Sequence, residues 1–471
     1  MDITINLFTL RHQFQCILPP LHVMCTCFIL LALNITPSVA ANDIVKKTKE
    51  EQLKQEFNEL SQRHYLNASR SIVNAMPATA LKALIKTIKT LEASGDITHA
   101  IATIINNKSI LIQSSGYNEI NDVIEFLLNH NQLALAEEYY QPITMNADVY
   151  VTSKTDFLFA RYHFSFQDYP TTLRYATSIS LAEVLSAEQK DYITLIFGAS
   201  LQETQKHREA IPILQKIASD SIYYPYAQLN IAIANIRQGW WTDGHLAIKK
   251  ALQSKAIEDN NDLISKELKN RLYLVLGYSQ FQNEFYRNAR DSFRKIELDS
   301  IYINRALLGL GLSALSQKDY DAALNAFSYL KDSKTTDLTH AEAHIMLPYT
   351  YEIMGEIEQA TVLYTESIAF FEKKILDITQ QNLQLKNLPV KVLAMECAKH
   401  NKSITHMLSA TQTMLTEAKS DHSRTNISHL LNKLQSACIT MGNHANATMI
   451  ENIQSYQSQS QFALARLYDK Q

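Results

Sequence analysis

The chain of 471 residues has few of the residues that break helices and little excess charge of either sign. It contains only 10 glycines and 10 prolines, roughly a third to a half of their average share. With few breakers and frequent Ala, Leu, Ile and Gln, the sequence favours helices joined by short turns. The formal net charge is −3, and the lysines and arginines are scattered along the chain. Because nucleic-acid-binding proteins normally show a basic face, we expect no nucleic-acid partner.

Motifs that carry enzyme chemistry are also missing. The sequence has no GxSxG elbow, no P-loop and no His-Arg-Asp loop, and without a CxxC pair a structural zinc site is not expected. Gly309-Leu-Gly311-Leu-Ser-Ala314 imitates a dinucleotide fingerprint, but it falls inside an expected helix and does not follow a strand. His340 and His344 would share one helix face, and without a third ligand we expect surface histidines. We therefore expect no catalytic residue, no cofactor and no metal.

The first forty residues differ from the rest of the chain. An apolar run over residues 23–33 is followed by Ser38-Val39-Ala40, which fits a cleavage site before Ala41. The run is about as long as a signal-peptide core and too short to span a bilayer comfortably. We predict a secretory signal over residues 1–40, of bacterial type, and a periplasmic mature chain. The alternative is an uncleaved segment that anchors the protein in the inner membrane.

Two of the five cysteines lie outside this leader. Cys397 and Cys438 are 41 residues apart, on two expected helices that could run antiparallel. In an oxidising compartment an even pair can form a disulfide. Two buried free thiols are the alternative, and the sequence leaves both readings open.

A small residue followed four positions later by a large apolar one recurs along the chain. The first members of these pairs step by 34, 45, 34 and 37 residues, a near-constant period that is typical of a stacked two-helix repeat. Small side chains are needed where two helix axes approach, and large ones fill the gap toward the next pair. The pairs are Ala210 with Leu214, Gly244 with Ile248, Ala289 with Phe293, Ala323 with Phe327 and Ala360 with Tyr364.

This pattern resembles the tetratricopeptide repeat (TPR), in particular its exported bacterial type. In the clearest unit, Leu310-Gly311 lies in the first helix, and Tyr320, Ala323 and Phe327 lie in the second. The resemblance implies an all-α fold, a right-handed α-solenoid of stacked helix pairs with a C-terminal helical region; an irregular helical array is the alternative. The eight expected units start at Leu81, Tyr117, Ser153, Asp191, Pro225, Asn270, Asn304 and Ala341.

The repeat gives an expected division of the chain. Residues 41–80 are expected to form a capping helix and a linker, residues 81–371 the TPR-like repeats, and residues 372–471 a helical cap or bundle that covers the end of the array. Two polar insertions, at 254–262 and 332–339, are expected to be loops.

The repeat family that the sequence resembles binds ligands along a concave surface lined by the first helices. At the corresponding positions this chain has apolar and aromatic side chains with a few arginines, and Tyr and Arg are enriched at binding hot spots. Such a groove suits an extended peptide or an amphipathic helix; alternatively, the C-terminal region folds back into it. The predicted partner-binding groove consists of Tyr192, Tyr226, Arg271, Tyr278, Phe281, Arg305 and Tyr349.

Together these features predict an exported, non-enzymatic scaffold that binds a protein or peptide partner in cell-envelope assembly or export. Peripheral association with membrane complexes is compatible with this prediction. The alternatives are a helical envelope hydrolase or lyase, and a cytoplasmic peptide-sensing regulator whose N-terminus has been misread. A repeat fold by itself does not decide among them.

Overall fold

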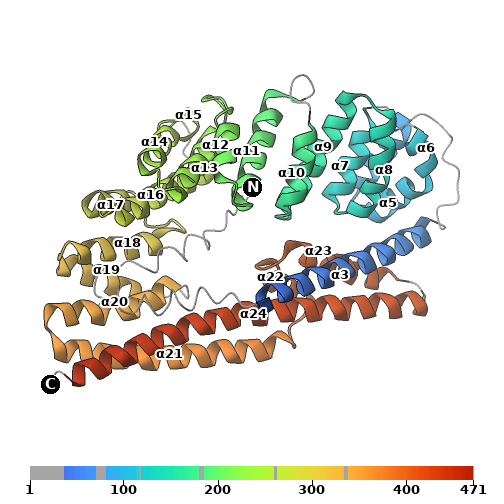
Figure 1. Cartoon of the computed structure of the whole chain (residues 1–471). Helices are drawn as coiled ribbons and strands as arrows, with labels where there is room; N and C mark the ends of the chain where they lie inside the picture. Colours follow the sequence, from blue (N-terminus) through green and yellow to red (C-terminus); the bar gives the residue numbers. More distant parts are fainter. Residues whose placement is uncertain are drawn as a thin grey trace. The chain divides into compact units, whose positions relative to one another are not determined.

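The computed structural model describes residues 37–69, 81–113, 115, 118–179, 185–258, 262–333, 338–418 and 420–469. Within these ranges the regular elements are helices, α3 to α24, and no strand occurs (Figure 1). The all-α fold expected from the sequence is therefore confirmed. Residues 1–36 of the predicted signal segment lie outside the described ranges. None of the described helices is long and apolar enough to cross a membrane.

The chain forms two compact units, which are described separately. Unit 2 contains Leu53–Leu272 and Glu372–Ser455, whereas unit 1 contains Tyr273–Phe371, Tyr456–Gln471 and the chain before Leu53. Four helices contribute residues to both units: α3 (Pro37–Ser69), α16 (Leu263–Gln282), α21 (Ile357–Leu385) and α24 (Asp421–Tyr468).

Unit 2 holds five helix pairs and part of the C-terminal region. The pairs are α4 (Leu81–Ala93) with α5 (Ile97–Asn106), α7 (Ile120–Asn129) with α8 (Leu133–Asn146), α9 (Val149–Ser165) with α10 (Tyr169–Ser178), α11 (Ala187–Glu203) with α12 (His207–Leu214), and α13 (Tyr224–Arg237) with α14 (Trp241–Leu252). Also in unit 2 are α6 (Lys108–Gln113), α15 (Lys255–Glu258), α22 (Val390–Ala398) and α23 (Lys402–Glu417). Helix α15 is one turn long and lies inside the insertion at 254–262, which was expected to be only a loop.

Unit 1 holds three further pairs. They are the second half of α16 with α17 (Tyr286–Phe293), α18 (Ile303–Ser316) with α19 (Tyr320–Asp332), and α20 (Leu338–Met354) with α21. The described residues thus contain the eight helix pairs that the sequence period predicts.

First helices of neighbouring pairs touch each other, as well as their own second helices. In unit 2, α9 contacts α11 and α11 contacts α13, and in unit 1, α18 contacts α20. Most second helices also contact the following first helix, as α12 does with α13 and α19 with α20. Within each unit this arrangement makes a stack in which the first helices form one continuous layer, so the fold is TPR-like.

Close approaches occur at glycine, both within a pair and between successive pairs. A Cβ added to Gly311 would lie 2.4 Å from the ring of Phe327, and one added to Gly309 would lie 2.4 Å from the ring of Phe293. Both rings are almost fully buried, so neither can move aside. Gly198 is limited in the same way by Leu214, at 2.5 Å. The large residues of the sequence pairs, such as Phe327 and Leu214, therefore contact a neighbouring helix at its glycine.

Each turn from a first to a second helix contains one residue in the left-handed conformation. Among the described residues, positive φ occurs only at Gly95, Asn131, Gln167, Gln205, Gly239, Glu284, Lys318 and Gly355. The last five step by 34, 45, 34 and 37 residues, which repeats the sequence period. Three of the eight are glycines, for which this conformation has no steric cost; the other five carry side chains. In three turns an aspartate follows and caps the second helix, as Asp319 does by accepting from the Ala322 amide.

The C-terminal helices form their own apolar core with part of α3. In unit 2, Leu53 and Phe57 of α3 pack with Leu393, Leu408 and Leu434 from α22, α23 and α24. The structure also joins Cys397 and Cys438 in a disulfide, with their Cα atoms 5.2 Å apart. Helix α3 is thus part of the same core as the C-terminal helices of unit 2.

Candidate partner-binding surface

The first helices carry large hydrogen-bonding side chains at one equivalent position of the repeat. In unit 2 these are Tyr192 on α11, Tyr226 on α13 and Arg271 on α16; in unit 1 they are Arg305 on α18 and Glu342 on α20. We call these five residues the first-helix row. Each precedes the residue at the close helix approach, such as Gly198 or Gly311, by six positions. Four members belong to the predicted groove.

The two tyrosines of the row differ in exposure. Tyr192 is 8% exposed, and its ring centroid lies 6.2 Å from that of Phe157 and 5.6 Å from that of Tyr223. It therefore packs between helices. Tyr226 is half-buried. Burial, together with Asp262, raises the pKa of Tyr226, against a lowering by Arg271. Tyr226 therefore keeps part of its side chain exposed to solvent, whereas Tyr192 does not.

Three charged groups from successive first helices influence one another in unit 2. Burial raises the pKa of the Glu203 carboxyl, and Arg237 and Arg271 oppose this shift. Burial also lowers the pKa of Arg237, against the effect of Glu203. Arg271 itself is only 8% exposed. The first-helix face of unit 2 therefore combines the half-buried Tyr226, Glu203 and Arg237 with the buried Arg271.

In unit 1 the predicted groove residues mostly support the helix stack. The Tyr278 hydroxyl donates to the Arg305 carbonyl at 2.7 Å, and its ring lies 5.0 Å from that of Phe293. Burial raises the pKa of Tyr278. Phe281 is 7% exposed and lies against Tyr286. Tyr278 and Arg305 are thus brought together across α16 and α18, while Phe281 belongs to the core.

The last part of α24 covers α20 in unit 1. The Tyr456 hydroxyl donates to Glu342 at 2.9 Å, and Arg466 donates to both carboxylate oxygens of Glu352 at 2.7 Å. Both contacts join residues 114 apart in the sequence, so the two helices run parallel, as successive first helices do. Tyr349 lies half-buried on α20 between these contacts. In unit 1 the C-terminal region therefore folds back onto the face that was expected to bind a ligand, which is the alternative that the sequence left open.

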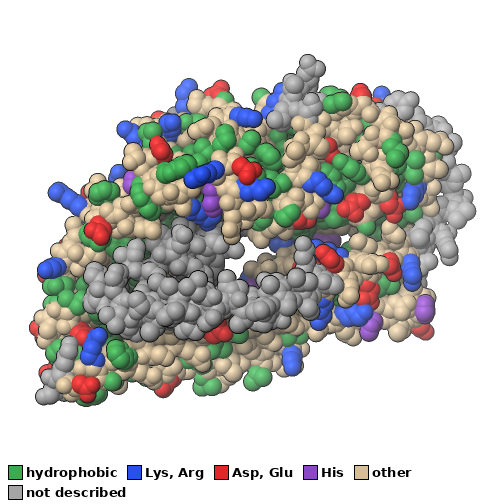
Figure 2. Space-filling model, viewed as in Figure 1, with side chains coloured by type: hydrophobic (Ala, Val, Ile, Leu, Met, Phe, Trp, Pro, Cys, Tyr) green, Lys and Arg blue, Asp and Glu red, His purple; other side chains and the backbone are tan. Residues whose placement is uncertain are grey.

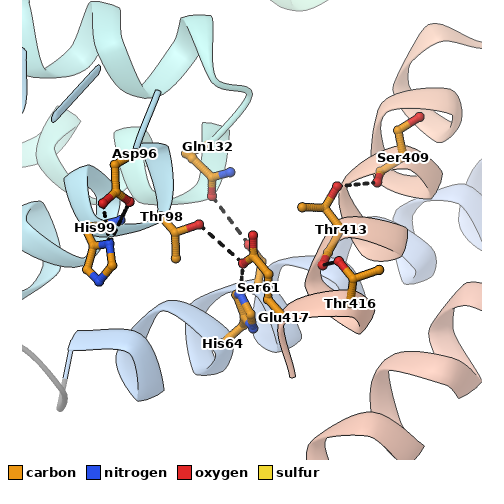
Figure 3. Close-up of polar contacts among 10 residues, drawn as sticks. All are labelled: Ser61, His64, Asp96, Thr98, His99, Gln132, Ser409, Thr413, Thr416 and Glu417. Carbon is orange, nitrogen blue, oxygen red and sulfur yellow. Dashed lines mark hydrogen bonds and ion pairs between the residues drawn. The ribbon is translucent and has the colours of Figure 1, made fainter. Parts of the chain in front are cut away.

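A polar junction in unit 2 holds α3 to elements that are distant in the sequence (Figure 3). Glu417, at the end of α23, lies 3.1 Å from His64 Nε2 and accepts from the Thr98 hydroxyl at 3.3 Å. The Ser61 hydroxyl donates to Gln132 at 3.5 Å. Sequence reasoning missed this junction, since its residues are separated by up to 353 positions. It positions helices and encloses no sizeable cavity among the described residues.

The histidine pair on α20 is not on the surface as expected. His344 is 6% exposed, and its ring stacks on Phe370 with centroids 3.8 Å apart. Burial, aided by His340 and Lys331, lowers the pKa of His344 to about 3. The prediction of surface histidines was wrong for His344, because α21 places an aromatic ring over it. In the described part of the chain, no three His, Cys, Asp or Glu side chains are grouped as metal ligands.

Figure 2 shows Lys and Arg side chains mixed with Asp and Glu over the described residues of one face. The first-helix face itself carries charges of both signs. The charge distribution thus gives no strong signal for a polyanionic ligand at this surface.

Comparisons with known proteins found similar solved structures, but no family. No protein-family model matches the sequence, and no curated protein matches it. The structure is similar to pilF of Pseudomonas aeruginosa, with 14% identity over 50% of this chain and 97% of that chain and a TM-score of 0.33. It is similar to the apo form of the quorum sensor NprR of B. thuringiensis, with 14% identity over 67% of this chain and 97% of that chain and a TM-score of 0.38. It is also similar to the human IFIT1 dimer with PPP-AAAA, with 14% identity over 83% of this chain and 87% of that chain and a TM-score of 0.31. Likenesses at this level identify neither a partner nor a function.

Proposed function

We propose that this protein is an exported, non-enzymatic scaffold that holds a protein or peptide partner on its first-helix faces, in cell-envelope assembly or export. The observation that carries the proposal is the face of unit 2, where Tyr226 lies beside Arg271, and Arg237 and Glu203 complete a mixed-charge set. The folded helices hold these groups in place, so a partner that docks there meets a preorganised face.

The chemistry of this face indicates what kind of segment it would hold. Two guanidinium groups and a tyrosine edge favour a segment that presents carboxylates next to apolar side chains, because guanidinium binds carboxylate through paired hydrogen bonds. Glu203 adds one acceptor for a donor on the partner. A short extended or helical peptide segment fits such a surface better than a small substrate, since the groups come from three helices in succession.

Export is supported by two independent features. The leader ends in small residues before Ala41, and the mature part contains one joined cysteine pair, Cys397 with Cys438. Disulfides persist in oxidising compartments and are rare in the cytosol. Both features favour the periplasm as the location of the mature chain.

Photocrosslinking in cells tests the proposal. A photoreactive phenylalanine analogue at Tyr226 is expected to capture a specific partner, and the same analogue at Leu246 is not. Leu246 lies on α14, the second helix of the same pair, and is 49% exposed. Arg271→Gln is expected to lower the capture from position 226 about tenfold, the loss typical of a hot-spot contact, in a variant that circular dichroism shows to be folded. In the crosslinked product, this protein is expected to begin at Ala41.

Equal capture from both positions, or none from position 226, would contradict the proposed binding face. If this protein retains residues 1–40 in the crosslinked product and fractionates with the cytosol, export is contradicted, while the proposed binding face is not.

A further inference from the structure

A basic and apolar surface lies in unit 2 on helices other than the first helices, where α21 ends and α22 and α23 begin. Its charged residues are Lys386, Lys391, Lys399 and Lys402, all exposed. Glu396 is the one acidic side chain between residues 381 and 405, and it lies 2.6 Å from Lys399. We call the four lysines, with the exposed side chains of Leu383, Val392 and Met395, the lysine tip.

Helix α22 shows why this surface faces outward. Leu393, Ala394 and Cys397 point into the core shared with α23 and α24, where Cys397 is held by its disulfide. The opposite side of the same helix presents Lys391 and Met395, one turn apart. The helix is therefore amphipathic in an uncommon sense, because its exposed side carries lysines and large apolar side chains together.

The apolar members of the tip are unusually open to solvent. Leu383 is 70% exposed, Met395 66% and Val392 41%. Apolar side chains that gather beside charges of one sign on a surface mark an interaction site more often than scattered ones do. The neighbouring stretch of α24, residues 436–446, contains no Lys, Arg, Asp or Glu, so it does not neutralise the lysines.

We propose that the lysine tip docks this protein on an anionic phospholipid surface. Along residues 381–405, four lysines against one paired glutamate complement the charge of anionic headgroups, each lysine contributing on the order of 1 kcal/mol near such a surface. Leu383, Val392 and Met395 enter the boundary between headgroups and acyl chains, as the apolar side of an interfacial helix does. The tip shares no residue and no helix with Tyr226 and Arg271, so this inference does not rest on the partner-binding proposal.

Vesicle sedimentation tests the proposal on the full mature chain with its disulfide intact. The protein is expected to sediment with vesicles of equal parts phosphatidylcholine and phosphatidylglycerol, and not with phosphatidylcholine alone. Lys391→Glu with Lys402→Glu is expected to weaken binding about thirtyfold, from the loss of two lysine contributions. Both positions lie in the first turn of a helix, where an acidic side chain is favourable, so the fold is preserved.

The matched control is Lys206→Glu with Lys255→Glu. These exposed lysines also lie at helix starts in unit 2, next to α12 and in α15. The control is expected to bind as the wild type does. Leu383→Ser with Met395→Ser is expected to weaken binding about tenfold even at high salt, because apolar burial is not screened.

Three results would overturn the proposal. The first is equal binding to both kinds of vesicle, and the second is an equal loss for the test and control variants. The third is absence of vesicle binding together with binding of soluble polyglutamate that depends on Lys391 and Lys402, which would assign the tip to an acidic protein instead.

Discussion

Replacing Phe327 by alanine is expected to lower the free energy of unfolding by about 4 kcal/mol, the usual cost of removing a buried phenylalanine ring. Phe327 is fully buried on α19 and packs directly against Gly311 of α18. The glycine has no side chain that could fill the space left by the ring. The loss is measured by urea denaturation followed by circular dichroism at 222 nm, a standard helix signal.

Tyr329 supplies the control on the same helix. It is 65% exposed, so Tyr329→Ala is expected to change stability by less than about 0.5 kcal/mol. Similar losses for the two variants would mean that the α18–α19 pair does not pack at Gly311, and the repeat assignment for unit 1 would fail.

Breaking the disulfide is expected to cost a similar amount in unit 2. Cys397 and Cys438 close a loop with a sequence separation of 41, and the chain-entropy model gives about 4 kcal/mol for a loop of this length. The disulfide joins α22 to α24, which share a small apolar core. Because this core is small, its packing offsets little of the stability that is lost with the disulfide. Denaturation of the mature chain with and without reductant, and of Cys438→Ser, measures the effect.

The reductant and the substitution are expected to lower stability equally, and together they are expected to do no more than either alone. The oxidised mature chain is expected to show no free thiol. A wild type that titrates two thiols after isolation from the periplasm, or that is unaffected by reductant, would contradict the disulfide and remove one support for export.

The repeat could be predicted from the sequence because its rule is local. A small residue at a close helix approach and a large one four positions later, as in Ala323 and Phe327, lie within one helix and need no knowledge of the rest of the chain. The turns were harder, since only three of the eight left-handed residues are glycines. Glu284 and Lys318 give no composition signal for that conformation.

Contacts between distant segments could not be predicted in the same way. Nothing in the spacing of α3 indicates that Leu53 and Phe57 pack with helices that follow residue 389, or that His64 meets Glu417. The groove positions were identified from the repeat register, but register alone does not give burial. Phe281 is part of the core, and Tyr349 is flanked by α24 contacts; neither could be seen without the tertiary packing.

The lysine tip was overlooked for a related reason. Lysines counted along the whole chain look scattered, and the chain is close to neutral. Only the fold shows that Lys391 and Lys399 share the outer side of α22 while Leu393 and Cys397 face inward. Local charge excess is a property of a surface, and average composition does not report it.

Native-state hydrogen exchange, read by mass spectrometry, tests most directly whether the chain is a stack of helix pairs. We expect slow exchange in the first helices α11, α13 and α18, interrupted by fast-exchanging turns at residues 205, 239, 284, 318 and 355, with the same uneven steps as the sequence period. Protection that runs unbroken through residues 203–207 and 316–320, or first helices that exchange as fast as the turns, would contradict the stack of helix pairs.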